Sequence, residues 1–274
     1  PPLRSSAASD VYKRQDITGV PTQTWELLNH PDRDKYDLSS LRTLGGGGGP
    51  RPAEHVKLLD KNFKGRPGIG YGLTETNALG TLASGDEYVD HPSSAGRVVP
   101  PLTQIKIIDK DWNELPEGSI GEVAIKSQSN MKGYWRNESA TKECINEHGW
   151  FKSGDLGKFD GPFLYILDRL KDMVIRGGEN IACPEVEGAI YEHPDVLEAS
   201  VFGIPDERLG EILCTSIYLR DNSNVKEETI HDFLSNKLAA FKIPAVIKFS
   251  TEPLPKLASG KFDKPTLRGL FENK

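Results

Sequence analysis

The sequence predicts an α/β remnant, then a small antiparallel β-barrel, then an α+β domain. Up to residue 95, apolar strand-like runs alternate with amphipathic helical patterns. After Gly96 the pattern changes to short strands of alternating apolar and polar residues, separated by Gly, Pro and Asn, as in a small barrel. From residue 173 strands and helices mix again over roughly 100 residues, the size of a compact domain.

Composition excludes several classes of protein. The 274 residues are 36% hydrophobic and 27% charged, which supports a globular core rather than global disorder. No run approaches ~18 consecutive apolar residues, so we expect no membrane span. The net charge of −6 disfavours nucleic acid as a partner. Three widely separated cysteines and six histidines without ligand spacing predict neither a disulfide framework nor a transition-metal site.

The first residues differ from the rest of the chain. Residues 1–15 lack an initiating Met, show no periodicity and contain no apolar run of a signal peptide. They resemble translated library-adapter sequence, so we expect a non-native scar, the alternative being a natural disordered tail. If this segment is a scar, we expect the natural chain to begin upstream.

The elements of the first segment follow from local signals. Residues 18–30 predict a helix with Pro21 in its first turn. Residues 38–44 lead into a strand, residues 53–62 predict a second helix, and residues 65–72 predict a loop and strand. This order is β-α-β material of an α/β sheet.

The barrel is expected over residues 96–167. Its clearest strands are 104–109, 121–126 and 163–167. A charged run, Asp168–Asp172, then marks the domain boundary. We therefore expect residues 16–167 to form one domain, with its α/β part at 16–95, and residues 168–274 to form a second.

The second domain is expected to begin with a strand and a Gly-Gly turn. Its predicted elements are strand 173–176, helix 184–192, strands 196–203 and 214–219, helix 227–237 and strand 246–249.

Two glycine-containing segments in the first domain are candidates for nucleotide contacts. Gly45–Gly49 fits a flexible linker, which we favour for the segment alone, or a Cβ-free surface for a planar ring. Gly70–Glu75 (GYGLTE) fits a turn capped by Thr74. It fits a nucleotide site at least as well, with an aromatic for a base, a hydroxyl for a phosphate and a carboxylate for Mg²⁺.

Three later segments have both an ordinary and a chemical interpretation. Asp155, in WFKSGD, is a common turn residue or a carboxylate for a ribose diol. Residues 168–172, followed by GGEN at 177–180, form a solvated linker and hairpin or a hinge with an arginine for phosphate. Lys261, in PKLASGK, is a solvated loop lysine or a cation for an anionic ligand in a locally basic region.

The order of these segments is more informative than any one of them. The Gly-rich run, YGLTE, GYW…GWFKSGD, YILDRLKDMVIRGGENI, PEVE and PKLASGK follow one another over about 220 residues. This arrangement resembles the adenylate-forming superfamily, in its AMP-dependent acyl-CoA synthetase branch, and would make the chain a C-terminal fragment. Such enzymes join a carboxylate to ATP as an acyl-adenylate and then transfer the acyl group to coenzyme A.

The resemblance implies roles for residues of the first domain. Gly47, Gly48 and Tyr71 would line the adenine site. Thr74 would contact the α-phosphate and Glu75 would ligate Mg²⁺, so both count with the catalytic residues.

It also implies roles around the second domain, which would be a lid. Asp155 would bind the ribose hydroxyls and Arg169 the ribose or phosphate. Lys261 would bridge the carboxylate and the α-phosphate in the first step. Lys171 would be the hinge, whose rotation brings Gly177 and Gly178 towards the thioester-forming site.

One part of the family pattern does not occur in the sequence. The Ser/Thr/Gly-rich phosphate loop that ends in Pro-Lys-Gly is not found before Gly70. We therefore expect the chain to be inactive alone. An adenylating enzyme with another acceptor, such as a carrier protein, and a non-catalytic AMP-binding protein remain alternatives. A fatty or similar carboxylic acid is the favoured substrate class and the cytoplasm the default location, while the oligomeric state stays open.

Overall fold

The computed structural model describes residues 15–221 and 223–272. Contacts divide the chain into two units. The first comprises Pro1–Lys106, Ala124–Ser153 and Phe159–Tyr165, and the second comprises Ile107–Val123, Gly154–Lys158 and Ile166–Lys274. The expected scar lies outside the described residues except for Gln15, and the expected domain boundary at Asp168 stays a prediction.

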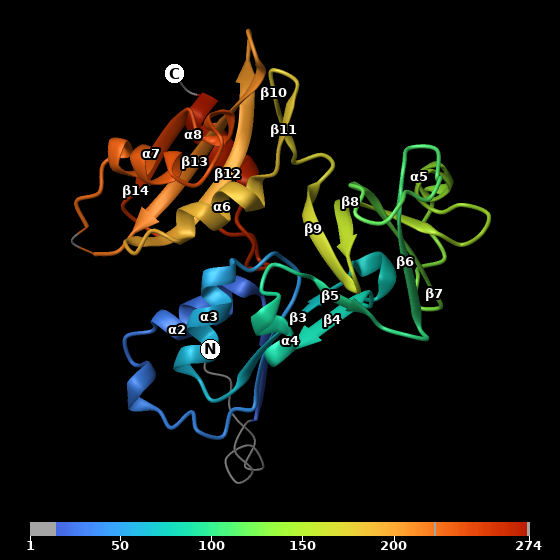
Figure 1. The fold of residues 1–274 in the computed structure, drawn as a ribbon, viewed down its shortest axis with the longest axis horizontal. Helices are drawn as coiled ribbons and strands as arrows, with labels where there is room; N and C mark the ends of the chain where they lie inside the picture. Colours follow the sequence, from blue (N-terminus) through green and yellow to red (C-terminus); the bar gives the residue numbers. More distant parts are fainter. Residues whose placement is uncertain (1–14, 222, 273–274) are drawn as a thin grey trace. The chain divides into compact units, whose positions relative to one another are not determined.

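The first unit begins with a parallel sheet. Strands β1 (Asp16–Gly19), β2 (Thr43–Gly46) and β3 (Arg66–Tyr71) pair in parallel, with Asp16 opposite Thr43 and Thr43 opposite Arg66. Helix α2 (Pro21–Asn29) connects β1 to β2, and helix α3 (Ala53–Asn62) connects β2 to β3 (Figure 1). The predicted order of strand, helix and strand over residues 38–72 is therefore confirmed, and α3 has the predicted bounds. Strand β1 is a difference, because the helix expected from residue 18 begins only at Pro21.

Both helices bury one face against this sheet. Pro21 occupies the first turn of α2, where its missing N–H costs no hydrogen bond. The apolar cluster between helices and strands consists of Trp25, Leu28, Leu41, Leu44, Leu59 and Phe63. A second apolar cluster contains Val56 of α3, Ile69 of β3, and Ala83 and Tyr88 from the segment that follows β3.

The sheet then becomes antiparallel. Strand β4 (Thr81–Ser84) pairs with β3, β5 (Gly96–Val98) pairs with β4, and β9 (Phe163–Arg169) pairs with β5. The remaining strands are β8 (Phe151–Asp160), β7 (Gly121–Ser127) and β6 (Thr103–Ile108), and the order is β1-β2-β3-β4-β5-β9-β8-β7-β6. Short helices α4 (Asp86–Asp90) and α5 (Glu138–Cys144) and the 3₁₀ turns η1 (Arg33–Lys35) and η2 (Thr74–Thr76) complete this part.

This order corrects the prediction of a small barrel over residues 96–167. Among the described residues the pairing path is open and ends at β6. A barrel closes only when its first and last strands pair. Strand β5 instead uses its second edge for β4, so these strands extend the preceding sheet and do not form a separate closed one.

The second unit contains a five-stranded sheet. Its order is β11 (Glu179–Ile181), β10 (Val174–Arg176), β13 (Gly210–Leu219) and β12 (Val196–Asp206), with β14 (Val246–Ser250) parallel to β13. The long antiparallel pair β12–β13 places Val201 opposite Thr215 and Phe202 opposite Cys214. All predicted strands of this domain are present.

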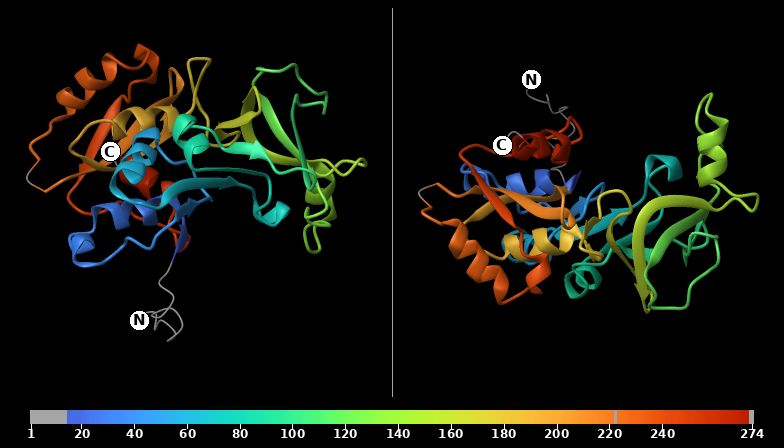
Figure 2. Two further views of the ribbon diagram at one scale, coloured as in Figure 1. Left: turned by 60° about the horizontal axis from the view of Figure 1, so that its bottom comes forward. Right: turned by 90° about the horizontal axis from the view of Figure 1, so that it is seen from above.

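Helices cover both faces of this sheet (right panel of Figure 2). Helices α6 (Cys183–Tyr191) and α7 (Glu227–Ser235) pack on one face, where Val201, Leu213 and Ile217 point into the core with Ile190 and Leu234. On the opposite face α8 (Lys264–Glu272) packs Leu267 and Phe271 against Phe202 and Cys214. The alternation between Val201 and Phe202 follows the two-residue period of a strand. The 3₁₀ turn η3 (Ala240–Lys242) precedes β14.

Candidate active site

The glycine run forms a close backbone contact in the first unit. Gly47 follows β2 and forms a parallel bridge with Gly70 of β3. A Cβ atom at Gly47 would lie 2.9 Å from the carbonyl oxygen of Gly70, closer than real Cβ contacts allow. Gly48 has a φ of 80°, a left-handed conformation that favours glycine. Both glycines are thus required by the backbone, and their contact with adenine stays a prediction.

The segment after β3 turns sharply and exposes one hydroxyl. Tyr71 ends β3 and is half-buried, and the 3₁₀ turn η2 follows. The turn is capped by Thr76, whose Oγ1 accepts a hydrogen bond from Leu73 N at 3.0 Å. Thr74 is exposed and has no part in this cap. The fold therefore leaves the Thr74 hydroxyl at the surface, beside Glu75, as a phosphate contact would require.

Glu75 is held by a tyrosine far away in sequence. Tyr134 Oη donates a hydrogen bond to Glu75 Oε1 at 2.9 Å, and Met131 N donates to the Glu75 carbonyl at 2.7 Å. Partial burial raises the pKa of Tyr134 to about 12, and the hydrogen bond and charge of Glu75 add to the shift. The carboxylate therefore has a fixed orientation at the tip of η2.

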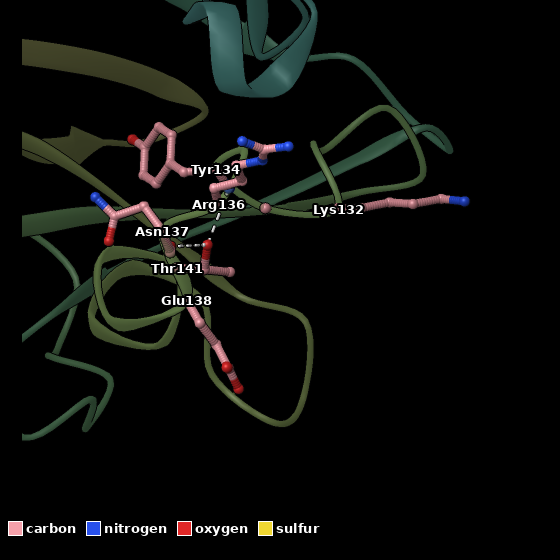
Figure 3. A pocket seen from close by; sticks show the side chains of 7 residues that line it. Lys132, Tyr134, Arg136, Asn137, Glu138 and Thr141 are labelled. Atoms are coloured by element: carbon pink, nitrogen blue, oxygen red, sulfur yellow. Dashed lines mark hydrogen bonds between the residues drawn. The ribbon is translucent and has the colours of Figure 1, made fainter.

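Tyr134 lies at an open hollow whose other side chains are polar (Figure 3). Thr141 Oγ1 accepts a hydrogen bond from Tyr134 N and donates one to Asn137 O, each at 2.9 Å. In the sequence, Tyr134 stands out only as part of the GYW motif. No spacing rule connects it to Glu75, 59 residues earlier.

Asp155 and Arg169 come together in the second unit. Arg169 Nε lies 3.6 Å from Asp155 Oδ1, and Asp155 is buried while Arg169 is exposed. Gly154 precedes Asp155 with a φ of 73° inside β8, and its N–H donates to Glu122 Oε1 at 3.0 Å. Leu170 N donates to Gly154 O at 2.9 Å, which ties the residue after Arg169 to the one before Asp155. The common turn anticipated for Asp155 is in fact an irregularity within a ten-residue strand.

Lys261 belongs to the same electrostatic neighbourhood. It is exposed on the loop before α8. Partial burial of its ammonium lowers the pKa of Lys261, and the positive charge of Arg169 lowers it further, while Asp155 acts in the opposite direction. Two cations and one carboxylate therefore share a field that an anionic ligand would neutralise.

The predicted hinge lies in a tight turn. Lys171 is exposed, and Asp172 N and Met173 N both donate to Arg169 O at 3.0 Å. Gly177 and Gly178 form the turn between β10 and β11 with φ values of 59° and 90°. Both are exposed. This geometry is compatible with a hinge and a glycine face, and neither role is tested by it.

The first unit brings together Gly47, the strand that ends at Tyr71, and the turn with Thr74 and Glu75. The second unit brings together three other predicted residues, Asp155, Arg169 and Lys261. It also holds Asp168, which the sequence analysis missed as an individual residue. Asp168 is buried and accepts hydrogen bonds from Arg169 N at 2.8 Å and Cys183 N at 2.7 Å.

Within 15–221 and 223–272, no group of three or more His, Cys, Asp or Glu gathers as a metal site. One carboxylate with phosphate oxygens and water is a common Mg²⁺ set, and the Mg²⁺ role of Glu75 stays a prediction. In that same part of the chain, no helix has the length and apolar character needed to cross a bilayer.

Comparison with protein families matches most of the chain. A family model described as AMP-binding enzyme matches residues 4–135, and one for the AMP-binding enzyme C-terminal domain matches residues 185–261.

Individual proteins are similar along nearly the whole chain. Feruloyl-CoA synthase of Amycolatopsis sp is 37% identical over 257 residues, which cover 93% of this chain and 51% of that protein. The mitochondrial medium-chain acyl-CoA ligase ACSF2 of Danio rerio is 36% identical over 256 residues, which cover 92% of this chain and 42% of that protein. ATP-bound MatB from Rhodopseudomonas palustris superimposes with a TM-score of 0.84 at 30% identity, covering 97% of this chain and 53% of that one. The chain therefore spans about half the length of the relatives it matches.

Proposed function

This chain belongs to the AMP-binding enzyme family, among the AMP-dependent acyl-CoA synthetases, and from that premise we propose that its protein is an acid–thiol ligase. The proposed reaction joins a carboxylate, ATP and coenzyme A to give acyl-CoA, AMP and pyrophosphate. An acyl-adenylate is the intermediate.

The observation that carries this proposal is the contact of Arg169 Nε with the buried carboxylate of Asp155 at 3.6 Å, with the charges of both side chains acting on Lys261. A buried carboxylate can accept both hydroxyls of a ribose, as no cation can. Two cations beside it suit the phosphate that the same nucleotide carries. A relative with 30% identity is known with ATP bound, which supports a nucleotide as ligand.

In the first step a carboxylate oxygen attacks the α-phosphorus and pyrophosphate leaves. Negative charge builds on the oxygens of both reactants, and an ammonium between them stabilises it. We assign this task to Lys261. Thr74 would donate its exposed hydroxyl to the α-phosphate, and Gly47, Gly48 and Tyr71 would line the adenine.

Mg²⁺ bound by Glu75 would neutralise phosphate charge. Tyr134 supports this assignment, because its hydrogen bond orients the Glu75 carboxylate.

In the second step the thiol of coenzyme A attacks the acyl carbon and AMP leaves. We propose that residues 168–274 form a lid that turns about Lys171 between the steps, with residues 16–167 as the remainder of the adenylating domain. This rotation would withdraw Lys261 from the adenylate and bring Gly177 and Gly178 towards the thioester-forming site.

The favoured substrate is a fatty or medium-chain acid. One relative is named for medium-chain acids and another for ferulate, so an aromatic acid is the competing class. The 274-residue sequence has no phosphate loop before Gly70. We therefore propose that this chain by itself binds AMP and catalyses no adenylation.

The test compares two proteins: the one translated from the complete reading frame, and this 274-residue chain. We expect the first to show ATP–pyrophosphate exchange with octanoate, palmitate or ferulate, and release of AMP once coenzyme A is added. If the acyl group is transferred to a carrier-protein thiol, and no acyl-CoA forms when coenzyme A is added, a carrier protein replaces coenzyme A as the acceptor. If the protein from the complete reading frame shows no pyrophosphate exchange with any acid but binds AMP in calorimetry, its function is nucleotide binding and not ligation.

A further inference from the structure

We propose that the loop carrying Lys261 is held at both ends by partly buried ion pairs, Lys256–Glu198 before it and Lys264–Glu187 after it, and that these four side chains position Lys261 for adenylation. The inference rests on the proposed function, since it deepens the role of Lys261. It assigns positioning residues, none of which touches the substrate.

The first pair anchors the entry of the loop. Lys256 Nζ lies 2.7 Å from Glu198 Oε1, and Leu254 N donates to Glu198 Oε2 at 2.7 Å. Both carboxylate oxygens are thus used by the segment that leads to Lys261. Glu198 is only 8% exposed, and it lies on β12 next to the register shift after Val196.

The second pair anchors the exit. Lys264, the first residue of α8, lies 3.3 Å from Glu187 Oε1 of α6 and donates to Val201 O at 2.8 Å. Val201 N donates to the same Glu187 oxygen at 2.9 Å. Burial opposes the charge of Lys264, yet Glu187 and the neighbouring Cys183 and Asp168 raise the pKa of this lysine. The Lys264 ammonium therefore keeps its positive charge beside Glu187.

Between the anchors the chain forms a small hairpin. Lys256 bridges to Phe262, Leu257 N donates to Lys261 O at 2.8 Å, and Gly260 N donates to Leu257 O at 2.8 Å. Gly260 has a φ of 81°, which closes the turn without strain only for glycine. Leu257 and Lys261 are exposed at the tip of the hairpin, whereas Phe262 packs against the apolar cluster of Leu254, Phe202 and Phe271. The hairpin is therefore fixed at its two ends and not at its tip.

The exit anchor is also connected to Arg169. Glu187 lies on α6, and the first N–H of that helix, Cys183 N, donates to buried Asp168. Asp168 precedes Arg169 in the chain and accepts its N–H. One helix therefore joins the base of the Lys261 loop to the backbone of Arg169.

This connection matters because catalysis is sensitive to position. Displacing a reacting or stabilising group by about 1 Å can cost ~100-fold in rate. Removing one partner of a buried ion pair leaves an uncompensated charge and forces local rearrangement. Loss of either pair is therefore expected to misplace the Lys261 ammonium without altering its chemistry.

The kinetic test uses Glu198→Gln, Glu187→Gln and Lys264→Arg in the complete-reading-frame protein. The matched control is Glu185→Gln, since Glu185 lies on α6 and pairs with Lys242 at 2.6 Å but is less buried. We expect adenylate formation in the two glutamine variants to fall roughly 10- to 100-fold in kcat, with little change in KM for ATP. Thioester formation from supplied acyl-adenylate is expected to stay at the wild-type rate, and Lys264→Arg to retain most of the adenylation.

Equal losses in both half-reactions, or losses no larger than in the Glu185 control, would overturn the proposal. A second measurement covers the case of poor folding and does not depend on activity. Hydrogen exchange in the 274-residue chain should speed up in residues 254–264 of the glutamine variants, while β13 keeps its protection. Unchanged hydrogen exchange in residues 254–264 of the glutamine variants would also overturn the proposal. If the wild-type protein forms no adenylate from any acid, the proposed function fails. The hydrogen-exchange result then still decides whether the ion pairs anchor the loop.

Discussion

Tyr134 Oη lies 2.9 Å from Glu75 Oε1 and donates a hydrogen bond to it. The contact joins the loop after β7 to the turn after β3. Two further hydrogen bonds support it, from Asn77 Nδ2 to Ser129 O and from Ser129 Oγ to Thr76 O. The carboxylate assigned to Mg²⁺ is therefore part of a braced pair of loops.

Replacing Glu75 by Gln should lower the pKa of Tyr134 from about 12 towards its usual value near 10. The shift should be partial, because burial of the phenol is the larger cause and remains. Ultraviolet absorbance of the phenolate during an alkaline titration measures it, with Tyr134→Phe to identify the signal. An unchanged titration in the Gln variant would mean that the charge of Glu75 does not act on Tyr134 in solution.

Lys261→Ala should abolish most adenylate formation in the complete-reading-frame protein, by about 100-fold or more, as for loss of one preorganised charge-stabilising group. Thioester formation from supplied acyl-adenylate should be spared, because the proposed lid rotation withdraws Lys261 in that step. Pyrophosphate exchange and acyl-CoA release measure the two halves separately. Equal loss in both would refute the assigned role.

Lys171→Pro should slow thioester formation several-fold more than adenylation. Proline restricts φ at the turn where Asp172 N and Met173 N already close on Arg169 O, and so opposes rotation of the lid. The same two half-reaction assays measure the ratio, and Lys171→Ala is the control. If both variants leave the ratio at its wild-type value, Lys171 is a surface residue and the hinge lies elsewhere.

The first unit should lose stability as the solution becomes acidic. Burial, reinforced by the charge of Arg51, lowers the pKa of His55 from 6.5 to about 3. In the unfolded chain His55 binds a proton below about pH 6.5, whereas the folded state excludes it until about pH 3. The free energy of unfolding should therefore decrease as pH falls through this window, by ~1.4 kcal/mol per unit of pKa difference at most.

His55→Phe is the informative variant, because His55 stacks on Trp25 with ring centroids 3.7 Å apart and a phenyl ring can keep that contact. Denaturant unfolding followed by Trp fluorescence from pH 7 to pH 4 should show a shallower loss of stability in the variant. Parallel pH curves for both proteins would mean that His55 does not titrate with folding.

Local sequence signals placed the regular elements well. Helix α3 has the predicted bounds because its apolar positions recur at helical spacing and Pro52 precedes it. Helix α8 was missed, because its amphipathic pattern follows a loop rich in Pro, Gly and Lys. Strand β8 is not among the predicted strands, because Gly154 and Gly157 interrupt its pattern, and only its pairing in the sheet keeps those residues in a strand.

By itself, the sequence determined the order of the elements, the family and most of the candidate site residues, because these depend on neighbours a few positions apart. Only the tertiary structure decided that the sheet stays open at β6, that Tyr134 holds Glu75, and that Glu198 and Glu187 anchor the loop of Lys261. Those contacts join residues 58 to 77 positions apart. Such residues come together only when whole helices and strands pack against one another. The periodicity of the sequence predicts local structure, but it does not predict which distant side chain will pair with a given charge.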